Sequence, residues 1–192
     1  MTSSTGVGAE GREEPCLRIR LSFETMRRTR SLFFMLLILG SVGCDHATKQ
    51  LAHEALSGAA PISLIGDVVR LELAANQGAF LSLGADLPPA VRSVLLVGGV
   101  PILLALVCAA AFRMGLASPA AFAGLALITG GGLANWLNRI LHGGAVTDFV
   151  SLGLPGLRTG IFNLADVVIV AGFLLFAFQP RHDDDEARRT AT

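Results

Sequence analysis

Four long stretches of this chain carry few or no charged side chains, and they constrain its fold more than any other feature. They cover residues 31–52, 93–112, 116–137 and 161–178. A helix that crosses a bilayer needs about 20 predominantly apolar residues, and each stretch reaches or approaches that length. Hydrophobic residues make up 52% of the chain, and its mean hydropathy is +0.61. The sequence therefore predicts an all-α integral membrane protein with a bundle of four transmembrane helices.

Small residues and prolines within these stretches fit the same environment. The third stretch contains Gly130, Gly131 and Gly132, and small residues allow helices to approach closely inside a bilayer. Pro101 and Pro119 would be costly in a helix exposed to water, but prolines are tolerated in membrane bundles. These residues favour helices that pack against one another in lipid.

The distribution of lysine and arginine predicts the orientation of the bundle. Cytoplasmic loops carry an excess of these residues. One side of a four-span arrangement would carry Arg18, Arg20, Arg27, Arg28, Arg30, Arg113, Arg181, Arg188 and Arg189. The residues on the other side include Lys49, Arg70, Arg139 and Arg158. We therefore expect both termini to be cytoplasmic.

The chain is predicted to have three parts. Residues 1–30 form a disordered cytoplasmic tail, residues 31–178 form the membrane domain, and residues 179–192 form a second cytoplasmic tail with a solvated acidic run at 183–186. The 15 basic and 15 acidic residues balance, which gives no reason to expect a nucleic acid partner. The high apolar content excludes a wholly disordered chain.

The two segments on the external side differ in character. Residues 62–65 and 68–73 have the composition of strands, and Gly66-Asp67 between them suits a hairpin turn. They predict a small external β-sheet, or cradle, resting on the membrane surface. Residues 140–160 are rich in glycine and are predicted to form a loop.

Three cysteines give no sign of a metal site or a disulfide framework. Cys16, Cys44 and Cys108 lack the spacing of metal ligands, and we expect neither a metal nor another cofactor. Gly43-Cys44 follows an apolar run, as a lipid-attachment site would. However, Ser41 stands where such a site has an aliphatic residue. The sequence therefore favours an uncleaved first helix.

Two aspartates are the strongest candidates for a functional role. Asp166 is the only charged residue between Thr159 and Pro180. A carboxylate is costly in hydrocarbon, so it should face the protein interior or water and carry a function. Asp148 lies 18 positions earlier, near the same membrane face, and Asn163 precedes Asp166 by three positions on one helical face. We expect the two carboxylates to form a shared acid–base site.

Three other polar segments each have an ordinary structural explanation when taken alone. Lys49 could extend to the lipid headgroups from the end of the first span, and residues 76–80 could be a loop. Residues 135–139 could anchor the third span at the interface, where Trp136 would suit the aromatic belt.

Taken together, five motifs in this order resemble those of the lipoprotein signal peptidases, the type II signal peptidase family. They are Asp45-His46-Ala47-Thr48-Lys49, Asn76-Gln77-Gly78-Ala79-Phe80, Gly131-Gly132-Leu133-Ala134-Asn135-Trp136-Leu137-Asn138-Arg139, Val146-Thr147-Asp148-Phe149 and Phe162-Asn163-Leu164-Ala165-Asp166. Each motif is weak alone, whereas five in order on four predicted spans are specific. The resemblance covers residues 31–178.

The resemblance implies an intramembrane aspartic endopeptidase of the bacterial inner membrane. Such an enzyme removes the signal peptide of a prolipoprotein just before a cysteine that carries diacylglycerol. The implied partners are these prolipoproteins, membrane phospholipids and cyclic-peptide inhibitors of the globomycin type. By motif, the catalytic residues would be Asp148 and Asp166, the substrate-binding residues Asn76, Gly78, Asn135, Arg139 and Asn163, and the positioning residues Asp45, Lys49 and Asn138.

One position departs from the family pattern and supports an alternative. The family usually has Asp before the arginine of the third-span motif, where this chain has Asn138. Asn138 cannot form an ion pair with Arg139, so a weakened or non-catalytic protein that binds lipidated peptides is the second hypothesis. A small transporter is the third, but the third span offers no charged residue for a polar path.

Overall fold

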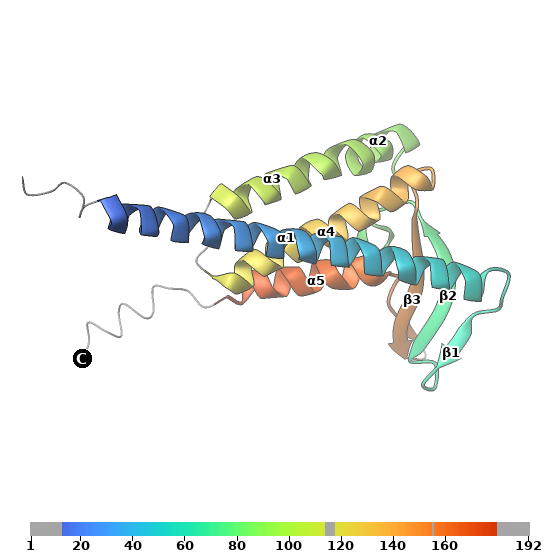
Figure 1. The fold of residues 1–192 in the computed structure, drawn as a ribbon. Coiled ribbons are helices and arrows are strands. Elements are labelled where there is room, and N and C mark those ends of the chain that lie inside the picture. The colour runs from blue at the N-terminus through green and yellow to red at the C-terminus, as the bar shows by residue number, and fades with distance from the viewer. Residues whose placement is uncertain (1–12, 114–117, 155, 180–192) are drawn as a thin grey trace, which may run out of the picture. The chain divides into compact units, whose positions relative to one another are not determined.

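The computed structural model describes residues 13–113, 118–154 and 156–179. The chain divides into two compact units, Met1–Leu36 and Leu37–Thr192. The first unit contributes the N-terminal part of the long helix α1 (Glu13–Leu56). The second contains the rest of α1 and all of the other helices and strands (Figure 1).

Helix α1 begins much earlier than the sequence predicted. Residues 13–30, assigned above to a disordered tail, are helical. The absence of apolar periodicity suggested disorder, but this segment is rich in Arg and Glu, which have high helix propensity. Its single proline, Pro15, lies in the first turn, where proline is tolerated. Residues 1–12 and 180–192, which contain the remainder of both predicted tails, lie outside the described residues.

Three of the four predicted spans coincide with helices long and apolar enough to cross a membrane. They are Arg28–Leu56, Pro89–Arg113 and Pro119–Leu141. The second of these is built from α2 (Pro89–Ser93), the π-helix η3 (Val94–Gly99) and α3 (Val100–Arg113), and the third is α4 (Pro119–Leu141). The fourth stretch forms α5 (Leu164–Ala177), with 14 residues. At 1.5 Å per residue α5 is about 21 Å long, so a fourth complete span remains a prediction.

Three consecutive glycines place α4 in close contact with three other helices. A Cβ atom added at Gly130 would lie 2.8 Å from Ser41 Cβ in α1, and one at Gly132 would lie 2.7 Å from Leu104 Cδ2 in α3. A Cβ atom at Gly131 would lie 2.6 Å from the Ala165 carbonyl oxygen in α5. Successive residues of a helix point about 100° apart, so each glycine opens a different face of α4 to a neighbour.

A four-stranded antiparallel sheet follows the order β1 (Ile62–Leu64), β2 (Val69–Asn76), β3 (Val146–Leu154) and β4 (Leu157–Arg158). The predicted hairpin between the first two strands is present. Ile65, Gly66 and Asp67 all have positive φ in its turn. The Asp67 carboxylate pairs with Arg70 at 2.7 Å and with Arg158 at 2.9 Å.

Strands β3 and β4 correct the prediction that residues 140–160 form a loop. The glycines of this segment suggested a loop, but Val146, Thr147, Phe149 and Val150 are β-branched or aromatic residues that favour strands. Antiparallel pairing of β2 with β3 places Ala74 opposite Asp148 and Asn76 opposite Val146. The pairing thus brings the end of β2 beside the Asp148 strand.

We expect Gly131→Ala to destabilise the protein by about 1–3 kcal/mol, because the added methyl group would meet the Ala165 carbonyl oxygen and force α4 and α5 apart. Gly40→Ala is the matched control, since a Cβ atom at Gly40 in α1 would meet nothing within 4 Å. That control should be neutral or stabilising by up to about 1 kcal/mol. Unfolding of the purified variants in detergent measures both effects, and equal stability would contradict the close contact.

Candidate active site

Asp148 lies in β3 with 1% of its surface exposed. Asn76, at the end of β2, donates a hydrogen bond from Nδ2 to Asp148 Oδ2 at 2.9 Å. Asn163 donates from Nδ2 to Asp148 Oδ1 at 2.6 Å. Burial raises the pKa of the Asp148 carboxyl above its ordinary value, although these two hydrogen bonds act in the opposite direction. The carboxyl group is therefore easier to protonate than one in water.

Asp166 lies in the first turn of α5 and is 6% exposed. Asn135 of α4 donates from Nδ2 to Asp166 Oδ1 at 2.9 Å, and the Asn163 backbone N–H donates to Asp166 Oδ2 at 3.2 Å. In return, the Asp166 backbone N–H donates to Asn163 Oδ1 at 3.2 Å. The two residues form a capping box, in which each side chain satisfies a backbone N–H at the start of the helix.

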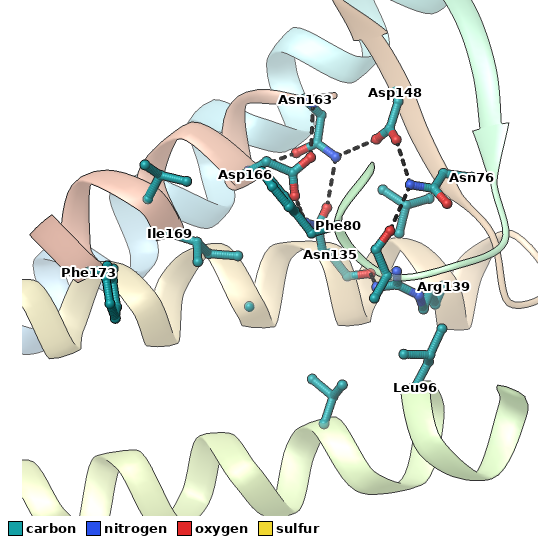
Figure 2. A pocket seen from close by; sticks show the side chains of 15 residues that line it. Asn76, Phe80, Leu96, Asn135, Arg139, Asp148, Asn163, Asp166, Ile169 and Phe173 are labelled. Carbon is teal, nitrogen blue, oxygen red and sulfur yellow. Dashed lines mark hydrogen bonds between the residues drawn. The ribbon is translucent and has the colours of Figure 1, made fainter. Parts of the chain in front are cut away.

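Asn163 is therefore the N-cap of α5. The sequence had placed it within the helix, on one face with Asp166. Its backbone is extended, with φ of −129°. The spacing of three residues still places Asn163 and Asp166 together, because the capping box has the same spacing as one helical turn. As a result, Asn163 contacts both carboxylates, Asp148 with its side chain and Asp166 with its backbone (Figure 2).

The orientation of the Asn135 amide is set by its neighbours. Lys49 Nζ donates to Asn135 Oδ1 at 3.0 Å, and Asn163 Nδ2 donates to the same oxygen at 3.1 Å. With two donors on its oxygen, Asn135 presents its NH₂ group to Asp166. The predicted positioning residue Lys49 thus acts on the site through Asn135.

Lys49 and Asp45 form a buried ion pair, with 2.7 Å between Lys49 Nζ and Asp45 Oδ2. Lys49 is 4% exposed, so the explanation that it extends to the headgroups is wrong. Asp45 Oδ1 accepts a hydrogen bond from the Ala165 backbone N–H at 2.9 Å. The pair therefore ties α1 to the start of α5 as well as to α4.

Arg139 reaches back toward the loop that follows β2. It donates from one guanidinium nitrogen to the Gly78 carbonyl oxygen at 2.6 Å and from another to the Asn135 carbonyl oxygen at 3.4 Å. Arg139 Nε is buried and has no hydrogen-bond partner among the described residues. A Cβ atom at Gly78 would lie 2.6 Å from the Ser82 backbone. The close approach of residue 78 to residue 82 in this loop therefore requires glycine.

Asn138 does not anchor Arg139. Its Oδ1 accepts a hydrogen bond from the Thr147 backbone N–H at 2.7 Å, and its Nδ2 lies 3.1 Å from His142 Nδ1. Arg139 is held by backbone carbonyl groups, so the absence of a carboxylate at position 138 leaves that anchor in place. The indole N–H of Trp136 donates to the Val97 carbonyl oxygen at 2.8 Å.

Both carboxylates line a pocket of about 340 Å³. Four of the five predicted substrate-binding residues line it too, namely Asn76, Asn135, Arg139 and Asn163, whereas Gly78 does not. Sequence reasoning missed its apolar wall. That wall is formed by Phe80, Leu96, Val100, Ile169, Val170 and Phe173 (Figure 2). A membrane helix is apolar on every side, so hydropathy alone does not mark the few apolar side chains that face a pocket. Within the described ranges, no group of three or more His, Cys, Asp or Glu residues could hold a metal ion.

This chain is similar to the members of one protein family. The family model described as "Signal peptidase (SPase) II" matches residues 37–180. A lipoprotein signal peptidase from Chlorobium phaeobacteroides is 33% identical over 139 residues, which cover 68% of this chain and 79% of that protein. Its counterpart from Treponema pallidum is 34% identical over 119 residues, which cover 59% of this chain and 63% of that protein. A third, from Rhodococcus jostii, is 35% identical over 68% of this chain and 63% of its own length.

Solved structures match the fold. One described as "Bacterial membrane enzyme structure by the in meso method at 1.9 A resolution" aligns with a TM-score of 0.66 and 20% identity, over 76% of this chain and 90% of that one. A second, described in the same words but at 2.3 Å resolution, aligns with a TM-score of 0.64 and 21% identity, over 74% and 84%. The fold of about three quarters of this chain is therefore similar to that of these two structures.

We expect Lys49→Met to destabilise the protein by about 3 kcal/mol, because removal of one partner leaves the buried Asp45 carboxylate without its cation. Arg70→Gln is the control, since the Arg70–Asp67 pair is about one-third exposed and should contribute less than about 1 kcal/mol. The double variant Asp45→Asn/Lys49→Met should be more stable than Lys49→Met alone, because it removes the unpaired charge. Unfolding in detergent provides the measurement, and similar losses for Lys49→Met and Arg70→Gln would contradict a buried pair.

Proposed function

This chain belongs to the signal peptidase II family, and from that premise we propose that it is an aspartic endopeptidase of the bacterial inner membrane. The family makes it a protease of a bacterial membrane, with lipoproteins as its substrates. We further propose that it cleaves a prolipoprotein just before the cysteine that carries diacylglycerol. The observation that carries the proposal is the pair of buried carboxylates, Asp148 and Asp166, joined through Asn163 at one pocket.

The proposed chemistry follows from the electrostatics of this pair. Two carboxylates that share one site do not both ionise readily, so one retains a proton while the other is charged. The charged member takes a proton from a water molecule as the water attacks the scissile carbonyl carbon. The protonated member donates its proton to the carbonyl oxygen. The pair titrates as a unit, and its two apparent pKa values belong to both residues together.

The surrounding amides orient the two carboxylates for this reaction. Asn76, Asn135 and Asn163 together supply a donor to each of the four carboxylate oxygens. Arg139 supplies positive charge at the same pocket, where it can stabilise the oxygen that becomes negative in the tetrahedral intermediate. We assign Arg139 this stabilising role and the three asparagines the role of positioning the catalytic pair.

The apolar wall of the pocket suits the acyl chains of the substrate. Among the lining residues, Ile169, Val170 and Phe173 belong to α5, Leu96 belongs to η3 and Val100 belongs to α3. A buried acyl CH₂ group is worth about 0.8 kcal/mol, so two chains provide a large part of the binding free energy. Phospholipids and cyclic-peptide inhibitors of the globomycin type would contact the same apolar surface.

A non-catalytic role in binding lipidated peptides is less well supported. That alternative rested on Asn138, which was expected to leave Arg139 without an anchor. In the described structure Arg139 bonds two carbonyl groups, and Asn138 bonds the Thr147 amide next to Asp148. A neutral residue at position 138 is therefore compatible with an intact site.

We also propose that α5 completes a fourth span, that both termini are cytoplasmic and that the sheet and the carboxylate pair lie at the external face. The arginine distribution supports this orientation. The sheet should lie outside the hydrocarbon region on whichever side it stands, because its exposed edges carry backbone groups that need water or a partner. Asp148, in β3, then lies outside the hydrocarbon region.

We expect Asp148→Asn and Asp166→Asn each to abolish cleavage of a lipidated prolipoprotein, with turnover reduced by at least about 10³-fold, because each removes one half of the acid–base pair. Both variants should still fold, since Asn accepts one hydrogen bond in place of the carboxylate. Turnover by the purified enzyme in detergent or lipid is the measurement. Substantial turnover by either variant would exclude the proposed chemistry.

The same assay includes a control for the substrate. Wild-type enzyme should cleave the unlipidated prolipoprotein far more slowly than the diacylglyceryl-modified form, because the acyl chains contribute binding free energy. Equal cleavage of the two forms would contradict the proposed recognition.

We expect a cysteine at Leu157 to react with a membrane-impermeant thiol reagent in intact cells, and a cysteine at Thr192 to react only after lysis. Leu157 lies in β4 and is 78% exposed, whereas Ser151 in β3 is fully buried and unsuitable for labelling. The three native cysteines are first replaced by serine. The reverse labelling pattern would overturn the proposed orientation.

A further inference from the structure

A second pocket, of about 430 Å³, adjoins the carboxylate pocket. Gln77, Arg92, Ser93 and the Gly143–Gly144 turn line it, at the ends of β2, α2 and α4. Leu96 and Arg139 line both pockets. The two pockets are therefore neighbours, and the second is the more polar of the two.

The segment Asn76-Gln77-Gly78 lies between the two pockets. Asn76 bonds Asp148 on one side, and the next side chain, Gln77, accepts a hydrogen bond from Arg92 at 2.6 Å on the other. Arg139 bonds the Gly78 carbonyl oxygen in the same segment. A peptide chain that leaves the carboxylate pair along this segment would pass Arg139 first and Arg92 next.

Arg92 carries a positive charge that the described structure does not neutralise. Its guanidinium group donates to the Ala85 carbonyl oxygen at 2.7 Å and to Gln77 Oε1 at 2.6 Å, and both acceptors are neutral. Among the described residues no carboxylate lies within 4 Å of it, whereas Lys49, Arg70 and Arg158 each pair with an aspartate. Arg92 is only partly exposed, so its charge is screened less than that of a fully exposed residue.

We propose that this second pocket binds the residues that follow the lipidated cysteine of the substrate, and that Arg92 favours an acidic side chain among the first few of them. This inference rests on the proposed peptidase function. The apolar pocket accounts for the acyl chains, which must stay in the hydrocarbon region, whereas the mature part of the substrate must leave toward water. The polar pocket at the ends of the helices provides that exit, and its charge selects the side chains that pass through it.

The test compares three diacylglyceryl-modified substrates that differ only at the second and third residues after the cysteine. These carry two serines, two aspartates or two lysines. For the wild-type enzyme we expect kcat/KM to be about fivefold higher for the aspartate substrate than for the serine substrate, and lowest for the lysine substrate. A fivefold ratio is at the upper end of what a partly exposed charge pair contributes. The preference should appear mainly in KM and should weaken as salt is raised.

Substitutions at Arg92 separate charge recognition from a structural role. Arg92→Lys should retain the preference for aspartate, and Arg92→Glu should reverse it in favour of lysine. A merely structural role for Arg92 could lower all three rates, but it could not reverse their order. Arg113→Gln is the matched control, because Arg113 lies at the end of α3, outside this pocket, and its removal should leave the preference unchanged.

The outcomes distinguish this inference from the function on which it rests. Failure to cleave any lipidated substrate would contradict the proposed function itself. Cleavage of all three at equal rates, or an unchanged order in Arg92→Glu, would overturn the inference alone. A phospholipid phosphate in the pocket is the competing occupant. In that case the serine substrate would be cleaved faster in phosphatidylglycerol vesicles than in phosphatidylcholine vesicles, and this difference would require Arg92. The enzyme would show no preference among the three substrates. That result would also overturn the inference.

Discussion

The hydrogen bonds of Asn163 hold the two carboxylates together, and most of the structure is arranged around them. A buried carboxylate needs donors on both oxygens, because an unpaired buried charge is very costly. Asn163 donates to Asp148 with its side chain and to Asp166 with its backbone, and it also begins α5. Asn163 therefore supplies hydrogen bonds to a carboxylate in a strand and to a carboxylate in a helix, and it also caps that helix. A substitution at this position would disturb both the geometry of the proposed catalytic pair and folding.

The requirement for donors extends outward from this residue to three helices. Asn135 of α4 can serve Asp166 because Lys49 of α1 occupies its oxygen, and Lys49 is in turn held by Asp45. Asp45 then returns to the start of α5 through the Ala165 amide. The network closes on itself, so its members depend on one another more than pairwise energies suggest. Polar residues outside the carboxylate pair thus take part in positioning it.

The sequence predicted the parts of this arrangement that follow from local chemistry. Apolar length identified the long helices. The cost of a carboxylate in lipid made Asp166 a candidate, and a position near the same membrane face added Asp148. The Gly66-Asp67 turn identified the first hairpin. What the sequence could not supply were partners distant along the chain, such as the burial of Lys49 against Asn135, 86 residues away. Strands β3 and β4 were missed because the glycines of residues 140–160 outweighed the β-branched residues of β3. The apolar side chains of the pocket were missed because they resemble those that face lipid.

The close contact at Gly131 also determines the angle at which α4 presents its polar side chains. Gly131, Asn135 and Arg139 are spaced four residues apart and form one stripe along the helix. A side chain extends about 5–6 Å from the helix axis, so turning α4 by 10° would shift its tip by about 1 Å. Displacements of that size can reduce a catalytic rate about 100-fold. Backbone contact with α5 therefore fixes the rotation of α4 about its axis. In this way Gly131 determines the direction in which the Asn135 and Arg139 side chains point.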